Sequence, residues 1–299
     1  FEPLPIRALR MVAHLEGPRA RTVIDMVVEN PHDRVLEGTL RHPLPQDASP
    51  AFFASFQGAP PVDPIKLVKA PERLLPPLAP DAGATADFAS IAVGAPGNRR
   101  APDWSELRVA RVVPREQGAQ VYEKVVRRRV DPSLLECAGG NDFETRVYPI
   151  APRSLKRVVL VYEQTLPFGD GLAHYALPLP ESPIPELEAH LFVDDGKAEV
   201  AALSVDGKDS AGAFTGNQGP FRAAALDLSG RAFAKELLLA TRPRQARGQF
   251  LVGGGDASLP GSFVFGRVLA EVPEVERAAE TGDAIFLVDT SLSEDGDRA

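Results

Sequence analysis

Residues 157–164 read Arg-Val-Val-Leu-Val-Tyr-Glu-Gln, and this stretch decides the fold class of the chain. Its side chains alternate between two faces, with Leu160 and Tyr162 on one and Val161 and Glu163 on the other. A period of two is that of a β-strand, and branched and aromatic side chains are favoured in strands. The stretch therefore predicts a strand with apolar side chains on both faces.

The same alternation occurs elsewhere along the chain. It runs through residues 7–40, with the turn Asn30-Pro31-His32-Asp33 inside that block, and again through residues 143–148. Further strand-like runs lie at residues 190–193, 198–205, 223–228, 236–240 and 263–270, separated by turns at Asp195-Gly196, Asp206-Gly207 and Ser229-Gly230. Asp-Gly and similar dipeptides are typical of hairpins. The sequence therefore predicts antiparallel sheets joined by hairpins.

Two segments depart from this pattern. Residues 116–130 place Ala119, Tyr122, Val125 and Val126 at helical spacing, which predicts one amphipathic helix. Residues 59–102 are rich in Pro and Ala, and we expect an elaborated loop there with short strands near residues 65–68 and 88–93.

Composition and net charge limit the classes of protein to which the chain can belong. The 299 residues are 44% hydrophobic and 25% charged, which is typical of a soluble globular protein with room for two domains. The absence of a run of about 18 apolar residues argues against direct membrane insertion. A net charge of −8 argues against nucleic acid as a partner. One basic cluster, at Lys124, Arg127, Arg128 and Arg129, fits either a solvated helix face or a contact with an acidic partner.

Residues with catalytic potential are few and scattered. The single Cys137 excludes a disulfide within the chain and has no basic neighbours that would activate a thiolate. Residues 253–255 are Gly-Gly-Gly, without the Gly-Lys-Ser/Thr ending of a phosphate loop. The five histidines lie in no recognisable motif, and we expect surface or structural roles for them: His14, His32, His42, His174 and His190. The sequence therefore favours a protein that is not an enzyme.

The last part of the chain combines an apolar run with a loop that carries oxygen-donor side chains. Residues 285–288 form an apolar run that predicts a buried strand, and Asp289, Ser291 and Ser293 follow it in a loop. One carboxylate and two hydroxyls are hard oxygen donors suited to Mg²⁺. The alternative is a turn and helix cap, because Asp and Ser are favoured in both roles.

Residues 6–166 resemble the vault and inter-alpha-trypsin inhibitor (VIT) domain. The motifs that carry the resemblance are residues 20–23 (ARTV), 28–31 (VENP), 129–136 (RVDPSLLE), 141–150 (NDFETRVYPI) and 156–167 (KRVVLVYEQTLP). In this family the domain is a β-rich module, commonly followed by a second β segment and a von Willebrand factor A domain. The resemblance implies a mainly β fold: an antiparallel, sandwich-like VIT domain with one main helix at 1–168, a β-rich connecting domain at 169–275, and the start of an α/β A domain at 280–299.

The loop after residue 288 resembles the metal-ion-dependent adhesion site (MIDAS) of the von Willebrand factor A domain. That resemblance implies a divalent cation, Mg²⁺ above all, held by Asp289, Ser291 and Ser293. In the family the ion accepts a carboxylate of a protein ligand. The remaining ligands, a Thr and an Asp, come from later loops that would lie beyond Ala299, so we do not expect residues 1–299 alone to bind the metal.

These resemblances imply a non-enzymatic adhesion or protein-interaction scaffold that positions a metal-dependent A domain, in an extracellular or cell-envelope location. A cytoplasmic location is the alternative, because related domains also occur on intracellular proteins. The alternative function is a self-associating structural subunit of an extracellular or envelope assembly, in which the metal loop is incidental. A hydrolytic activity within the β region is a third hypothesis.

Overall fold

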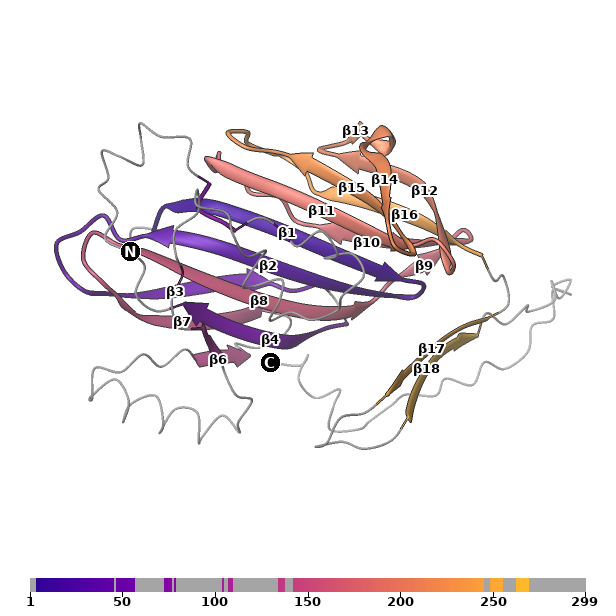
Figure 1. The fold of residues 1–299 in the computed structure, drawn as a ribbon, viewed down its shortest axis with the longest axis horizontal. Coiled ribbons are helices and arrows are strands. Elements are labelled where there is room, and N and C mark those ends of the chain that lie inside the picture. Colours follow the sequence, from indigo (N-terminus) through magenta and orange to yellow (C-terminus); the bar gives the residue numbers. More distant parts are fainter. Residues whose placement is uncertain are drawn as a thin grey trace, which may run out of the picture.

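The computed structural model describes residues 4–45, 47–56, 73–76, 78, 104, 107–109, 134–137, 142–244, 248–254 and 262–268. This part of the chain is mainly β, as the alternation predicts, and its strands form several sheets (Figure 1). Its only helical element is a short 3-10 turn at Ala211–Ala213.

The largest sheet has eight strands. In spatial order they are β14 (Phe214–Gln218), β15 (Phe221–Asp227), β11 (Glu186–Asp194), β1 (Ile6–Glu16), β2 (Arg19–Glu29), β8 (Leu155–Thr165), β4 (Ala48–Phe56) and β5 (Leu107–Val109).

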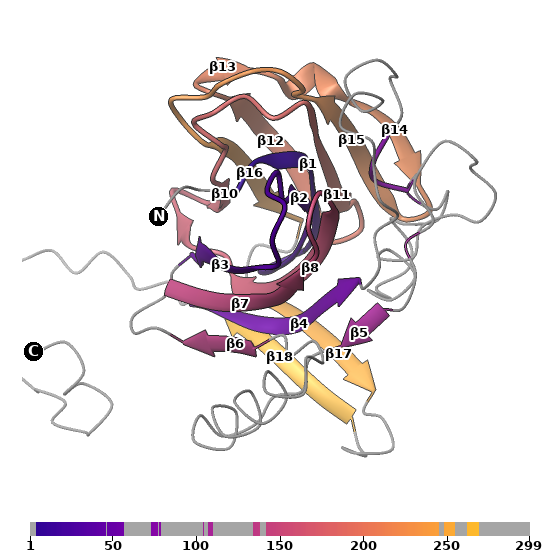
Figure 2. The same ribbon diagram turned by 90° about the vertical axis from the view of Figure 1, so that its left-hand side faces the viewer.

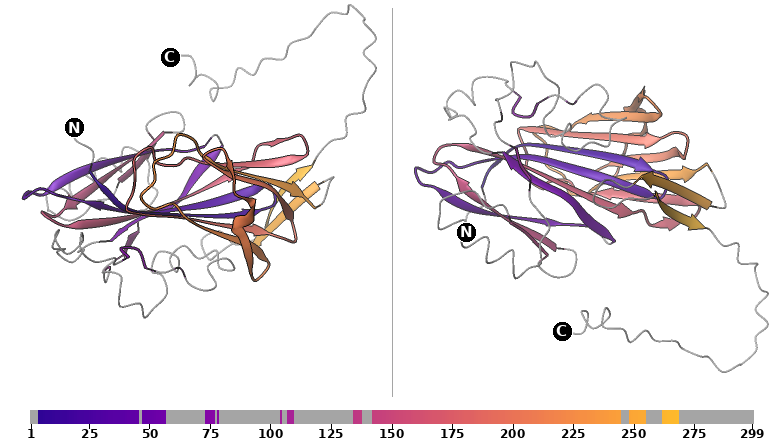
Figure 3. Two further views of the ribbon diagram at one scale, coloured as in Figure 1. Left: turned by 90° about the horizontal axis from the view of Figure 1, so that it is seen from above. Right: turned by 60° about the horizontal axis from the view of Figure 1, so that its bottom comes forward.

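Three smaller sheets complete the described part. A five-stranded sheet contains β13 (Lys208–Asp209), β12 (Ala198–Val205), β16 (Leu237–Pro243), β10 (Leu172–Leu177) and β9 (Phe168–Gly169). A three-stranded sheet contains β3 (Leu36–Pro43), β7 (Asp142–Ile150) and β6 (Leu134–Cys137). The hairpin of β17 (Gly248–Gly254) and β18 (Ser262–Val268) lies at one end of the molecule in both views of Figure 3.

The predicted strands at residues 7–40, 143–148 and 157–164 are confirmed as β1, β2, β3, β7 and β8. The turn after β2 is also present, and the buried side chain of Asn30 fixes it. Its Nδ2 donates to the carbonyl of Ile150 at 3.0 Å, while its Oδ1 accepts the backbone N–H of His32 at 2.9 Å. The amide thereby ties the start of the turn to the end of β7.

The main core lies between the inner face of the eight-stranded sheet and the five- and three-stranded sheets, which curve around a common interior in Figure 2. The inner face contributes aliphatic side chains such as Met11 and Leu191, and the five-stranded sheet contributes Leu203 and Leu239 from the other side. Burial of these apolar side chains is the dominant favourable contribution to folding.

One pairing in the large sheet is parallel. β1 pairs with β11 in parallel, from Ala8 opposite Glu186 to Leu15 opposite Val193, whereas every other pairing among the described strands is antiparallel. The predicted boundary between residues 168 and 169 falls within β9. β11 and β15, from beyond that boundary, lie in the same sheet as β1 and β2.

The prediction of hairpins at the three turns is wrong for two of them. Asp206-Gly207 does join the paired strands β12 and β13, and both residues have positive φ. The Asp195-Gly196 turn, however, leads from β11 in the large sheet to β12 in the five-stranded sheet, and Ser229-Gly230 leads from β15 back to that smaller sheet. A turn dipeptide reverses the chain but does not choose the sheet that receives the next strand.

Several predicted features lie outside the described residues. They are the helix at 116–130 with its basic cluster at Lys124 and residues 127–129, the short strands near 65–68 and 88–93, and the strand at 285–288 with Asp289, Ser291 and Ser293.

Candidate functional site

A row of charged side chains crosses the outer face of the large sheet. Arg10 lies opposite Asp25 in the β1–β2 register and opposite Glu188 in the β1–β11 register, so all three project from the same face. Arg10 and Asp25 are each 1% exposed and Glu188 is 8% exposed. Charged side chains are rarely so deeply buried unless they are paired, and each of these has a partner.

Asp25 binds Arg157 on β8 in a two-pronged ion pair. Arg157 Nε donates to Asp25 Oδ1 at 2.7 Å and Nη2 donates to Oδ2 at 2.6 Å. The guanidinium also lies over the ring of Phe56, 4.4 Å from its centroid. A planar guanidinium suits both contacts, because its fork matches a carboxylate and its face stacks on an aromatic ring.

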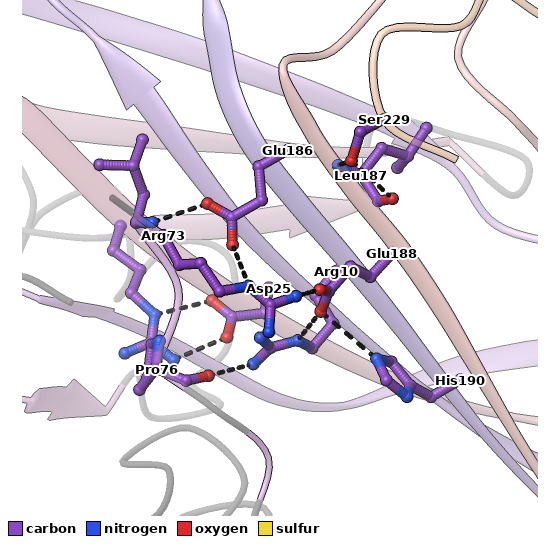
Figure 4. A network of polar contacts seen from close by, with 11 residues as sticks. Arg10, Asp25, Arg73, Pro76, Glu186, Leu187, Glu188, His190 and Ser229 are labelled. Carbon is purple, nitrogen blue, oxygen red and sulfur yellow. Dashed lines mark hydrogen bonds and ion pairs between the residues drawn. The ribbon is translucent and has the colours of Figure 1, made fainter. Parts of the chain in front are cut away.

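Glu188 gathers three basic side chains. Its Oε2 accepts from Arg10 Nε at 3.1 Å and lies 3.4 Å from Nε2 of His190, while its Oε1 pairs with Arg73. Figure 4 shows Arg10, Asp25, Arg73, Glu186, Glu188 and His190 in one cluster. The six residues of this group that lie on strands of the sheet are called the charged cluster below: Arg10, Asp25, Arg157, Glu186, Glu188 and His190.

The charged cluster holds a piece of backbone against the sheet. Residues 73–76 and 78, called the docked segment below, belong to the Pro- and Ala-rich passage. Arg10 Nη1 donates to the carbonyl of Pro76 at 2.5 Å, and Glu186 Oε2 accepts the N–H of Leu74 at 2.6 Å. On the other side, Trp104 Nε1 donates to the carbonyl of Leu74 at 2.9 Å.

Apolar contacts complete this attachment. Leu75 is fully buried and Leu74 is 5% exposed, and both pack with Ala8, Val27 and Leu155 from the outer face of the sheet. The passage expected to be an elaborated loop therefore includes a segment that packs as part of the structure. The N–H and carbonyl of Leu74 and the carbonyl of Pro76 bond to side chains of the sheet and of Trp104 rather than to a neighbouring strand.

The burial of the charged cluster shifts the pKa of two of its basic groups. Burial lowers the pKa of the Arg10 guanidinium to about 10, against the opposing effect of the nearby carboxylates of Asp25 and Glu186. Burial, followed by the positive charges of Arg10 and Arg73, lowers the pKa of His190 to about 4. His190 is therefore neutral at pH 7, and its Nε2 can donate a hydrogen bond to Glu188 in the corresponding tautomer.

The carboxylates of the charged cluster are occupied by other groups of the chain. A general base or nucleophile must face a substrate, whereas Asp25 is occupied by Arg157, and Glu186 and Glu188 bind the docked segment. Within the described ranges, no group of three or more His, Cys, Asp and Glu side chains is arranged to hold a metal ion. The metal site predicted at Asp289, Ser291 and Ser293 lies outside these ranges and stays a prediction.

No sequence motif identifies the charged cluster as a site, although one signal is present. Arg10 and Asp25 each interrupt an otherwise apolar stretch of a predicted strand, and Arg157 begins another predicted strand. A charged residue at such a position must either face water or find a buried partner. The partners lie at large distances along the chain, so a single sequence does not identify them.

Two of the five histidines take structural positions in the sheet. His14 is 6% exposed and stacks on Phe192 with 4.8 Å between ring centroids. His190 contacts Glu188 in the charged cluster. Both belong to the outer face of the large sheet, where the register pairs His14 with Phe192 on β11.

Comparisons with known proteins do not assign the chain to a family. No protein-family model matches the sequence, and no curated protein matches it. An M1 zinc metallopeptidase from Deinococcus radiodurans is similar over 93% of this chain and 51% of its own, with 8% identity and a TM-score of 0.38. A protein of Legionella pneumophila described as nutrient-binding is similar over 80% of this chain and 67% of its own, with 8% identity and a TM-score of 0.38. The chain thus spans about half the length of the metallopeptidase, and likenesses this weak identify neither fold nor activity.

Across the described ranges, no helix has the length and apolar character needed to cross a membrane.

Proposed function

We propose that the chain is a non-enzymatic protein-interaction scaffold. The observation that carries this proposal is that the charged cluster binds polypeptide. It contacts the backbone of the docked segment at Leu74 and Pro76 and its side chain at Arg73. The outer face therefore has the chemistry of a peptide-binding surface, in which main-chain groups and a charged side chain are both recognised.

The resemblance to VIT and von Willebrand factor A domains extends this proposal. In it, the β sheets form a rigid support, and the A domain that begins near residue 280 supplies a Mg²⁺ site with Asp289, Ser291 and Ser293 as its first ligands. The bound ion would complete its coordination with a carboxylate of the protein ligand. An extracellular or cell-envelope location belongs to the same proposal.

Titration of Mg²⁺ into a polypeptide that carries the whole A domain tests the metal-dependent part. We expect calorimetry to show binding that is lost in the Asp289→Ala variant, because the carboxylate is the only charged ligand in the loop. Asp283→Ala is the matched control, since it removes the same charge six residues before the loop and should leave binding unchanged. Equal Mg²⁺ affinity in the wild type and the Asp289→Ala variant would contradict the proposal.

The second candidate function is a self-associating structural subunit, which two features support. β14 lies at one edge of the large sheet, with Thr215, Gly216 and Asn217 exposed, and an open edge is a template for pairing with another chain. Leu238 is 44% exposed at a shallow hollow on the outer face of the five-stranded sheet. Light scattering over a range of protein concentrations tests this function, and a monomer throughout would contradict it.

A further inference from the structure

The docked segment is bound to the sheet in the manner of a ligand. Its contacts are Arg73 with Glu188, the N–H of Leu74 with Glu186, and the carbonyl of Pro76 with Arg10. None of these contacts depends on the segment belonging to the same molecule. Any extended peptide with a basic residue, two leucines and a proline could make them.

The residue types of the segment match this surface. Leu74 and Leu75 fill the apolar patch formed by Ala8, Val27 and Leu155, and the basic Arg73 meets the two carboxylates at its edge, with Glu186 Oε1 3.9 Å from its Nε. Pro76 has no N–H to leave unsatisfied, and a proline favours an extended conformation in the residue before it. The segment is thus complementary to the surface in charge, in apolar area and in backbone hydrogen bonding.

The length of the connecting chain allows the segment to reach another molecule. Sixteen residues, 57–72, separate the last residue of β4 from Arg73. A stretch of that length can span up to roughly 55 Å when extended.

We propose that the outer face of the large sheet also takes the docked segment of a second copy of the chain, so that two copies exchange these segments. The inference rests on the proposed function, because it treats this face as a protein-interaction surface and names its partner. The contacts are the same within one copy and between two copies. The connecting chain, residues 57–72, therefore determines whether the segment docks on its own copy or on another. An effective concentration on the order of millimolar for a tethered segment favours the closed monomer, and exchange needs crowded copies or a weakened internal contact.

Two complementary variants test the exchange. The first, Leu74→Ser with Leu75→Asp, keeps the site on the sheet but carries a segment that can no longer dock there. The second, Arg10→Met with Glu186→Gln, keeps the segment and loses two of the groups that hold it. We expect each variant alone to be a monomer of about the 32.0 kDa chain mass, and an equimolar mixture to contain a species of twice that mass by light scattering.

The single tryptophan gives an independent signal. Trp104 is the only Trp in the chain and donates to Leu74, so its emission reports whether a segment is docked. With Trp104→Phe added to the second variant, we expect the emission of the first variant to shift to shorter wavelength on mixing. The control is a second variant that also carries Leu74→Ser and Leu75→Asp, which should give neither the shift nor the larger mass.

The outcomes separate this inference from the proposed function. A synthetic peptide of residues 71–80 (PERLLPPLAP) is added to the first variant in a parallel titration. Binding of the peptide without a heterodimer would overturn the exchange between copies and leave the interaction function standing. Absence of both, with β circular dichroism retained, would contradict both proposals. If the first variant does not fold, Arg73→Ala with Leu75→Ala replaces it.

Discussion

The inner and outer faces of the eight-stranded sheet come from the same strands, yet different interactions stabilise them. On the inner face, aliphatic side chains such as Leu9, Met26 and Leu160 pack against the smaller sheets. On the outer face, Arg10 and Asp25 occupy the positions next to them in the same strands and bind other charged groups. Apolar packing is non-directional and accepts many sequences, whereas paired charges with fixed geometry accept few.

The polar groups of the two faces also differ in kind. Inside the core, Thr22 Oγ1 and Tyr175 Oη lie 2.9 Å apart, and burial raises the pKa of the Tyr175 hydroxyl well above its usual value. These groups are neutral at pH 7. The outer face instead holds full charges and a histidine that can titrate. The comparison implies that the core is insensitive to pH while the outer face and its docked segment respond to it.

The largest effect should come from breaking the buried ion pair on the outer face. Asp25→Ala leaves the fully buried Arg157 guanidinium without its carboxylate, and we expect a loss of about 3 to 5 kcal/mol in the free energy of unfolding. Denaturant titration measures this loss. The matched control is Asp33→Ala, which removes a carboxylate from an equally two-pronged but exposed pair with Arg153 and should leave the midpoint unchanged. Similar losses in both variants would show that burial does not distinguish the two pairs.

The second prediction concerns two variants, one that should lower the free energy of unfolding and one that should release the docked segment. Leu160→Ala opens a cavity on the inner face, and we expect a loss of about 2 to 5 kcal/mol in the free energy of unfolding. Because Leu160 faces away from the charged cluster, the native emission of Trp104 should be unchanged. Arg10→Met, in contrast, should shift the emission of Trp104 to longer wavelength, because it removes the side chain that donates to the carbonyl of Pro76. A shifted emission in the Leu160→Ala variant would show that the two faces are not independent.

The smallest effect is the acid sensitivity of the outer face. Burial lowers the pKa of His190 to about 4, below its unfolded value near 6.5, so the unfolded chain binds more protons between these values. The contribution of His190 is therefore fully present above about pH 6.5 and is lost as the pH falls toward 4, by up to about 3 kcal/mol. The groups that face it are Glu188, Arg10 and Arg73.

Comparison of the wild type with His190→Gln checks this effect. Glutamine does not titrate, so the variant should lose less stability than the wild type between pH 7 and pH 4.5, as measured by denaturant unfolding at each pH. Equal slopes for the two proteins would assign the acid sensitivity to other groups.

Much of the strand content could be predicted from the sequence. The alternation at residues 157–164 and within 7–40 identifies β8, β1, β2 and β3, because a strand's side-chain period of two depends only on neighbouring residues. The charged cluster was not predicted. Arg10 and Asp25 are charges within apolar stretches, but their partners are distant in the sequence: Glu188 lies 178 residues from Arg10 and meets it only across a parallel pairing.

Local sequence pattern was therefore enough to predict the mainly β character of the chain and the positions of most described strands, and the single cysteine excludes a disulfide within the chain. Tertiary contacts set the strand pairing, the return of β11 to lie beside β1, and the docking of residues from the Pro- and Ala-rich passage on the outer face. The physical reason is the separation along the chain of the residues that interact. Alternation and turn chemistry act over a few residues, whereas sheet order and buried ion pairs depend on contacts between distant segments that form together when the core closes.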